Sequence, residues 1–223
     1  MSAVQVPTFV QTSTLADAGR QEIVVTNKSH PWVYAISPQD WAEMTRMHEG
    51  AHVAASEALG IPVVDVWANP DQAVAHGGQY NNSAGDSQLQ CVVYAIGAFG
   101  GGQALHEAGY SEDLVEHSIT ALGYSDRVKT EKVAAEAAEQ GFQLDLRRAH
   151  HDALAVLFSA GFLDVTRSVA QALADQGDKL TGADVRAAMG DWQLDRNVWV
   201  PASDEFFPPP LTREDSDEME IEL

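Results

Sequence analysis

His48, Glu49 and His52 form the pattern His-Glu-Xaa-Xaa-His, whose residue types and spacing could do chemistry. On a helix, two side chains four positions apart leave the same face one turn apart. Two imidazoles placed in this way suit two corners of a tetrahedral zinc site. Glu49 can then take a proton from a water molecule that zinc has made more acidic, so that the water attacks a peptide carbonyl. The pattern predicts zinc-dependent peptide hydrolysis with Glu49 as the general base.

The residues around the pattern favour a metal site over two surface histidines on an amphipathic helix. The flanking positions are apolar or small, namely Met44, Met47, Ala51, Val53, Ala54 and Ala55. A buried helix that carries a polar His-Glu-His stripe needs partners for these groups, because unpaired buried polar groups are costly. We therefore expect His48 and His52 to be metal ligands.

A catalytic zinc ion needs a third protein ligand and one open position. Glu57 is near in sequence, but it does not have the spacing of thermolysin-like enzymes, and no third histidine follows at the metzincin spacing. The residues themselves leave the third ligand open. A purely structural zinc is disfavoured, because such sites usually close with cysteines and Cys91 is the single cysteine.

The pattern should lie on a helix that starts at the N-cap Ser37, with Pro38 in its first position, and stops at residues 60–62. Short strands are expected at residues 63–67 and 73–80. From Asp86 onward helices are expected over residues 89–105, 112–122, 126–139, 144–173 and 182–189. The sequence therefore predicts a mainly α fold with a small β element beside the helix of the pattern.

Three regions are expected along the chain. Residues 1–36 should form an extended N-terminal arm that includes the β-branched run 21–26. Residues 37–200 should form the metallopeptidase-like domain. Residues 201–223 are rich in proline and then in acidic residues, so we expect a disordered tail there.

The net charge of −20 limits the partners of the protein. A chain so acidic repels phosphates, so we expect no nucleic-acid partner. Solubility alone explains such a charge, and a basic protein partner or mimicry of nucleic acid is the other interpretation. No stretch approaches the roughly 18 apolar residues of a membrane span, and no basic region followed by an apolar run marks a signal peptide. We expect a soluble, cytoplasmic protein without a membrane partner.

Residues 37–190 resemble the peptidase domain of the FtsH family of AAA+ proteases. The segment 47–55 is similar to that family's His-Glu-Ala-Gly-His helix, and the two short strands follow it in the same order. Further on, residues 98–107 are similar to Leu-Gly-Gly-Arg-Ala-Ala-Glu-Glu, and residues 109–114 to Gly-Ala-Glu-Asn-Asp-Leu. The segment 180–186 also resembles the family's closing Leu-Asp-Gly-Glu-Glu-Ile.

The resemblance implies roles for further residues. Asp113 takes the place of the family's third zinc ligand, and Glu107 matches a glutamate near the site that could support a ligand from behind. His117 lies one turn after Asp113, so it could be a ligand, a substrate contact or simply a solvated residue. A strand suited to accept the substrate by β-addition is implied at Gly77, Gly78, Gln79 and Tyr80. Homo-oligomers are also implied, since the family forms hexamers.

The chain departs from the family at several points. Gly50 and Ala51 stand in reversed order, and Gln103 replaces an arginine. We find neither a Gly-rich phosphate loop ending in Lys-Ser/Thr nor a membrane anchor. We therefore expect a stand-alone, ATP-independent zinc endopeptidase that cleaves peptides or exposed protein segments. The alternative is a regulatory or binding protein that keeps the fold, does not cleave, and acts through its acidic surface; the intact Glu49 argues against it.

Overall fold

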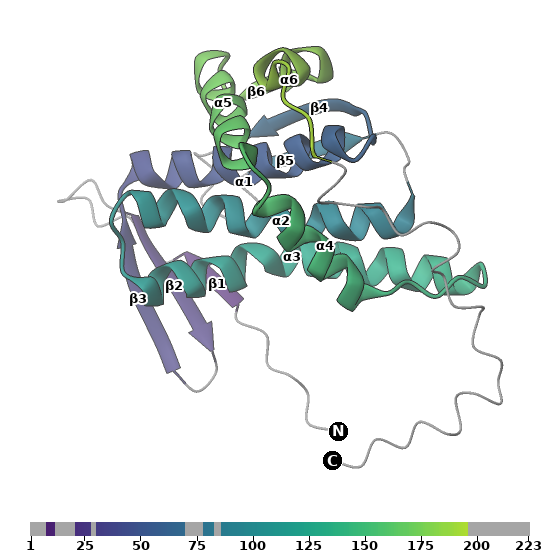
Figure 1. Ribbon diagram of the computed structural model, residues 1–223. Coiled ribbons are helices and arrows are strands. Elements are labelled where there is room, and N and C mark those ends of the chain that lie inside the picture. The colour runs from purple at the N-terminus through teal and green to yellow at the C-terminus, as the bar shows by residue number, and fades with distance from the viewer. Residues whose placement is uncertain (1–7, 12–20, 28–29, 70–77, 83–85, 196–223) are drawn as a thin grey trace.

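The computed structural model describes residues 8–11, 21–27, 30–69, 78–82 and 86–195 (Figure 1). This part of the chain is mainly helical and holds two small antiparallel sheets. The predicted fold class, mainly α with a small β element, is confirmed. The acidic tail 201–223 lies outside the described residues.

Helix α1 (Pro38–Ala58) carries the His-Glu-Xaa-Xaa-His pattern and forms where the sequence predicts it. The Ser37 side chain accepts a hydrogen bond of 3.0 Å from the backbone N–H of Asp40, which caps the helix. Every residue from Met47 to Ser56 is buried, because neighbouring helices cover this part of α1. The two histidines of the pattern therefore lie inside the protein.

Helix α2 (Ser87–Glu107) lies between α1 and α3 (Glu112–Glu139), and its glycines allow both neighbours to come close (Figure 1). A Cβ atom at Gly100 would lie 2.5 Å from the carbonyl oxygen of Met47 on α1. A Cβ atom at Gly102 would lie 2.4 Å from a side-chain carbon of α3. Since neither contact is sterically allowed, only glycine permits this close packing.

Replacing Gly100 by alanine is expected to lower the free energy of unfolding by about 1–3 kcal/mol, because the new methyl group overlaps the Met47 carbonyl oxygen and pushes α1 from α2. Gly123→Ala is the matched control. Among the described side chains, its methyl group would meet the Cβ of Ala98 at 3.4 Å, an ordinary contact, so we expect the stability to stay the same or rise by up to about 1 kcal/mol. Urea unfolding followed by circular dichroism measures both, and equal stabilities of the two variants would contradict the packing argument.

Helix α3 differs from the sequence prediction, which had placed two helices at residues 112–122 and 126–139. The structure has one continuous helix through this region. Gly123, which lies between the two predicted helices, costs only about 1 kcal/mol relative to alanine inside a helix. On either side of it, Leu122 and Asp126 are both buried and lie four positions apart on one face of α3. This buried face continues across residues 123–125, where the prediction had placed a break. Burial therefore outweighs the weak helix propensity of these residues.

The long helical segment predicted at residues 144–173 is two helices, α4 (Leu146–Leu157) and α5 (Phe162–Asp175). The break lies at Gly161, whose φ of 81° is a left-handed conformation that favours glycine. The last helix, α6 (Gly182–Met189), forms over the predicted residues, and Thr181 begins it with a capping box. No helix in the described ranges is long and apolar enough to cross a membrane on its own; α4 and α5 meet that test only as a pair, bent by 81°.

Helix α5 packs against the side of α1 that carries Gly50. A Cβ atom there would lie 3.1 Å from the carbonyl oxygen of Thr166, which is tighter than ordinary contact. Ala51, next in the chain, is fully buried and faces α2. The order Gly50-Ala51 therefore fits this packing, with the smaller residue toward the α5 backbone.

One sheet lies beside α1 and has the order β5-β4-β6. Its central strand β4 (Val63–Ala68) pairs antiparallel with β5 (Gly78–Asn82) on one side and with β6 (Lys179–Thr181) on the other. Strand β4 was predicted; β5 is described only for the last part of the strand expected at 73–80, and β6 was not predicted. Among the described strands, β5 forms an edge of this sheet.

A second sheet joins β1 (Thr8–Gln11), β2 (Gln21–Asn27) and β3 (His30–Ile36) in antiparallel order. Its strands lie in the region 1–36, for which an extended arm was predicted, and β2 includes the β-branched run. Strand β3 leads directly into α1, and Ile36 at its end is fully buried. The sheet therefore joins the rest of the protein at the start of α1.

Candidate metal centre

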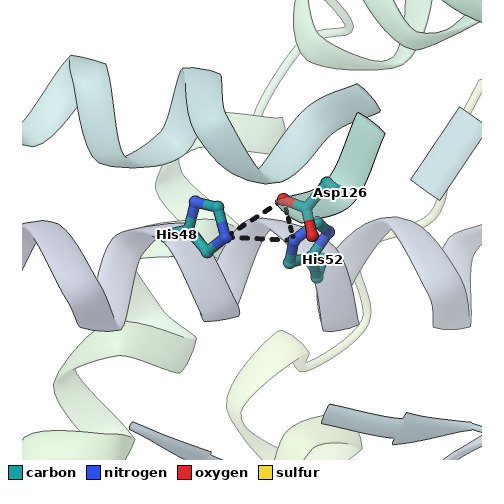
Figure 2. Close-up of side chains that lie close together, drawn as sticks. All are labelled: His48, His52 and Asp126. Carbon is teal, nitrogen blue, oxygen red and sulfur yellow. Dashed lines mark hydrogen bonds and ion pairs between the residues drawn. The ribbon is translucent and has the colours of Figure 1, made fainter. Parts of the chain in front are cut away.

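His48 and His52 of α1 meet Asp126 of α3 in one compact group, as Figure 2 shows. The Nε2 atoms of the two histidines lie 3.2 Å apart. The Oδ2 atom of Asp126 lies 3.3 Å from Nε2 of His48 and 3.1 Å from Nε2 of His52. The exposed fractions of the three residues are 8%, 1% and 1%. The three donor atoms therefore form a small, buried triangle.

The backbone of α2 orients the ring of His52. Its Nδ1 atom lies 2.9 Å from the carbonyl oxygen of Val93, which can only accept a hydrogen bond, so Nδ1 carries a proton and donates it. In a neutral imidazole this leaves a lone pair on Nε2, the atom that faces the triangle. Histidines that bind metals usually have their second ring N–H held by a carbonyl or a carboxylate in this way.

The triangle has the size of one face of a tetrahedral zinc site. Bonds of about 2.0–2.1 Å to zinc place tetrahedral ligand atoms about 3.3–3.4 Å apart, and the three separations here are 3.1, 3.2 and 3.3 Å. Nitrogen lone pairs and a carboxylate oxygen repel one another at this range unless a proton or a cation lies between them. The group of His48, His52 and Asp126 could therefore bind a metal ion.

Asp126 is held as a carboxylate by its surroundings. Burial raises its pKa, but without a bound ion the positive charge of a protonated His52 and hydrogen bonds from protonated His48 and His52 bring the pKa well below its usual value. Lys129 donates a hydrogen bond of 3.0 Å to Oδ1 of Asp126, which leaves Oδ2 toward the histidines. The Lys129 ammonium also lies 5.5 Å from the ring centre of Tyr94. The carboxylate is thus both ionised and fixed in direction.

Glu49 lies next to the triangle and is 5% exposed. Its Oε1 atom is 3.8 Å from Nε2 of His48. Burial raises the pKa of Glu49 to about 7, with His48 acting in the opposite direction and Asp126 raising it further. A carboxyl group with such a pKa can gain and lose a proton near neutral pH, which is what a general acid–base catalyst requires.

Two tyrosines border the group. The ring of Tyr80, on β5, packs against the imidazole of His52 with a centroid distance of 4.9 Å. Burial, followed by the neighbouring Tyr94 and the charges of Asp126 and Glu49, raises the pKa of Tyr80 well above its usual value. The Tyr80 hydroxyl therefore remains protonated and can donate a hydrogen bond.

Gly97 of α2 makes room for His52. A Cβ atom at this position would lie 2.2 Å from Nε2 of His52 and 2.4 Å from its Cε1. The imidazole therefore occupies the space that any side chain at residue 97 would need. This close approach allows Asp126, on the far helix α3, to reach the histidines past α2.

The third side chain of the group is Asp126, whereas the resemblance had pointed to Asp113. Asp113 is exposed in the first turn of α3. Because α3 is one continuous helix, Asp113 lies roughly 20 Å along its axis from Asp126, at about 1.5 Å per residue. The structure therefore replaces Asp113 by Asp126 as the candidate third ligand.

The other residues implied by the resemblance lie in different places. Glu107 is exposed and forms an ion pair with Arg167 and a hydrogen bond with Gln103, so it supports no ligand of this group. His117 is half-buried and does not belong to the group of three. Of the predicted substrate strand, Gly78, Gln79 and Tyr80 lie in β5, and Gly77 lies outside the described residues.

Neither a search against models of protein families nor a search of curated proteins finds a match for this chain.

Proposed function

We propose that this protein is a zinc-dependent endopeptidase. The observation that carries the proposal is the position of Glu49 beside the buried triangle of His48, His52 and Asp126. Two imidazoles and one carboxylate match the donor sets of catalytic zinc sites, which keep three protein ligands and one open position. Structural zinc sites usually close with four ligands, and cysteines are prominent among them. The donor set therefore supports catalysis with zinc as the cofactor.

The residues around the triangle have separate tasks in peptide hydrolysis. When bound, zinc supplies positive charge that acidifies water and polarises a peptide carbonyl. The Glu49 carboxylate takes one proton from the attacking water as the new C–O bond forms. It then delivers this proton to the amine nitrogen as the C–N bond breaks. Lys129 and the Val93 carbonyl keep Asp126 and His52 in position through their hydrogen bonds.

Strand β5 is the surface along which we propose that the peptide binds. It pairs with β4 on one side and forms the sheet edge among the described strands. The resemblance to the FtsH peptidase domain assigns β-addition to this strand. Because Tyr80 in β5 packs against His52, a peptide paired with β5 would pass close to the metal ligands. We propose peptides and exposed protein segments as substrates, cleaved without ATP.

Replacing Glu49 by glutamine is expected to lower the cleavage of fluorescein-labelled casein by at least about 100-fold, because the amide cannot accept the proton. The zinc content, measured by elemental mass spectrometry, is expected to stay at the wild-type value, since Glu49 is not one of the three donors. Glu43→Gln is the matched control, because Glu43 is exposed on the same helix, and its activity should be unchanged.

Two outcomes would contradict this proposal. A wild-type protein that holds zinc but does not cleave casein or a peptide library would instead be a non-cleaving binding protein. Equal turnover by the wild type and Glu49→Gln would mean that cleavage does not depend on this carboxylate, as expected if the zinc were structural.

A further inference from the structure

The hydroxyl of Tyr80 is a buried polar group that makes no hydrogen bond within the described part of the chain. The Tyr94 hydroxyl is near enough to raise the pKa of Tyr80 by its charge and as a weak hydrogen-bond acceptor, but the geometry of the two hydroxyls falls short of a full hydrogen bond. A buried hydroxyl without a partner costs free energy in the folded state, and such groups often mark a functional site. A bound ligand that accepts a hydrogen bond from this hydroxyl would explain why it has no partner within the chain.

The position of Tyr80 indicates which partner this is. Its ring lies against the imidazole of His52, tilted by 31°. The carboxylates of Asp126 and Glu49 are close enough to act on its hydroxyl. Tyr80 also lies on β5, the strand along which we propose that the peptide binds. A donor at this place faces the region where a peptide would meet the metal ligands and the general base.

We propose that the Tyr80 hydroxyl donates a hydrogen bond to the carbonyl oxygen of the peptide bond that is cleaved. This oxygen gains negative charge when water attacks the carbonyl carbon, so a donor held in place beforehand stabilises the transition state more than the substrate. The inference rests on the proposed peptidase function and names Tyr80 as a catalytic residue of the same site. Tyr80 keeps its proton throughout and forms no covalent bond.

The other donors near the group are less suited to this task. The Lys129 ammonium already donates to Oδ1 of Asp126. The Tyr94 side chain is only half-buried, so water can satisfy its hydroxyl in the absence of substrate. The Nδ1 atom of His48 is also buried without a hydrogen bond in the described chain, but it lies on the opposite side of the ring from the Nε2 atom that faces the triangle. Tyr80 is therefore the donor that the structure leaves available.

The test compares Tyr80→Phe with the matched control Tyr94→Phe, both as full-length zinc-loaded protein. With fluorescein-labelled casein, Tyr80→Phe should lower kcat by about 100- to 1,000-fold, with KM and zinc content close to wild type. A phosphonamidate peptide carries a charged tetrahedral oxygen in place of the carbonyl, so Tyr80→Phe should weaken its binding by a similar factor in calorimetric titration. The hydroxamate of the same peptide should bind with unchanged affinity, and Tyr94→Phe should behave as wild type in each assay.

A measurement on the metal-free protein separates catalysis from structural support. If Tyr80 serves the substrate, removing its unpaired hydroxyl leaves the melting temperature of the metal-free protein unchanged or raises it. If the hydroxyl holds the fold together, Tyr80→Phe lowers the melting temperature and weakens phosphonamidate and hydroxamate alike, which would overturn the inference.

The inference and the proposed function fail in different ways. Casein cleavage that depends on Glu49 but is equal in the wild type and Tyr80→Phe would refute the role of Tyr80 and leave the peptidase intact. A wild type without Glu49-dependent cleavage would refute the peptidase. In that case the phosphonamidate titration still tests the role of Tyr80. Equal binding by the wild type and Tyr80→Phe would show that the Tyr80 hydroxyl does not contact the tetrahedral oxygen of the inhibitor.

Discussion

Replacing Asp126 by alanine should lower the affinity for zinc by more than about 100-fold. Losing a group that only supports a ligand lowers metal affinity by roughly 10–100-fold, so a larger loss indicates a direct ligand. The change removes one of the three donor atoms of the triangle, in which Oδ2 lies 3.1 Å and 3.3 Å from the two histidine nitrogens. A site left with two imidazoles holds zinc weakly, because neither the third bond nor the negative charge remains. Competition against a chromophoric zinc chelator measures the affinity.

Asp113→Ala is the matched control for this experiment. Asp113 and Asp126 are aspartates of the same helix, but Asp113 is exposed in the first turn and does not belong to the group. We expect its replacement to leave the zinc affinity unchanged. Loss of zinc from Asp113→Ala together with retention in Asp126→Ala would show that the ligand implied by the resemblance is correct and that the helix arrangement differs from the one described.

Replacing Gly97 by alanine should also abolish tight zinc binding, although residue 97 is not a ligand. The new methyl group would lie 2.2 Å from Nε2 of His52, the very atom that faces the triangle. The ring is 1% exposed and its other nitrogen is bonded to the Val93 carbonyl, so it has little freedom to move aside. The imidazole must leave its position or the helices must separate by an amount that costs about 1–3 kcal/mol.

Gly100→Ala distinguishes loss of the site from general loss of packing. Gly100 lies one turn further along α2, where the new methyl group would overlap the Met47 carbonyl rather than a ligand. Both variants should be less stable than the wild type in urea, but only Gly97→Ala should lose zinc to the chelator at concentrations where the protein is folded. Equal zinc affinity of Gly97→Ala and the wild type would mean that His52 does not hold the ion through Nε2.

Local sequence signals predicted those helices whose first residues carry the side chains that start them. Ser37-Pro38 marks the start of α1 because a serine cap and a proline in the first turn act on the nearest backbone groups. Thr181 likewise marks the start of α6 through its capping box. The pair His48 and His52 could be recognised because helical geometry alone places both on one face.

Other features depend on contacts that no local signal contains. Asp126 becomes part of the metal group because α3 continues past Gly123, which is decided by burial against α2 rather than by helix propensity. Strand β6 has three residues and exists through its pairing with β4, so its sequence shows no strand pattern. The need for glycine at residue 97 appears only when His52 is seen in the space beside it. The segment 89–105 contains several glycines among apolar residues, but the sequence does not show the helix contacts that require them.

The pairing of β6 with β4 also limits when the protein can complete its fold during synthesis. Leu180 pairs with Val66, so the sheet beside α1 joins residues that lie far apart in the chain. A nascent chain that has not yet released residues 179–181 leaves one edge of β4 without its partner, and an unpaired strand edge can pair with other chains. Contacts between such distant residues also slow folding, because a long loop must close before they form. The growing chain is therefore open to misassembly from the emergence of β4 until residues 179–181 have left the ribosome.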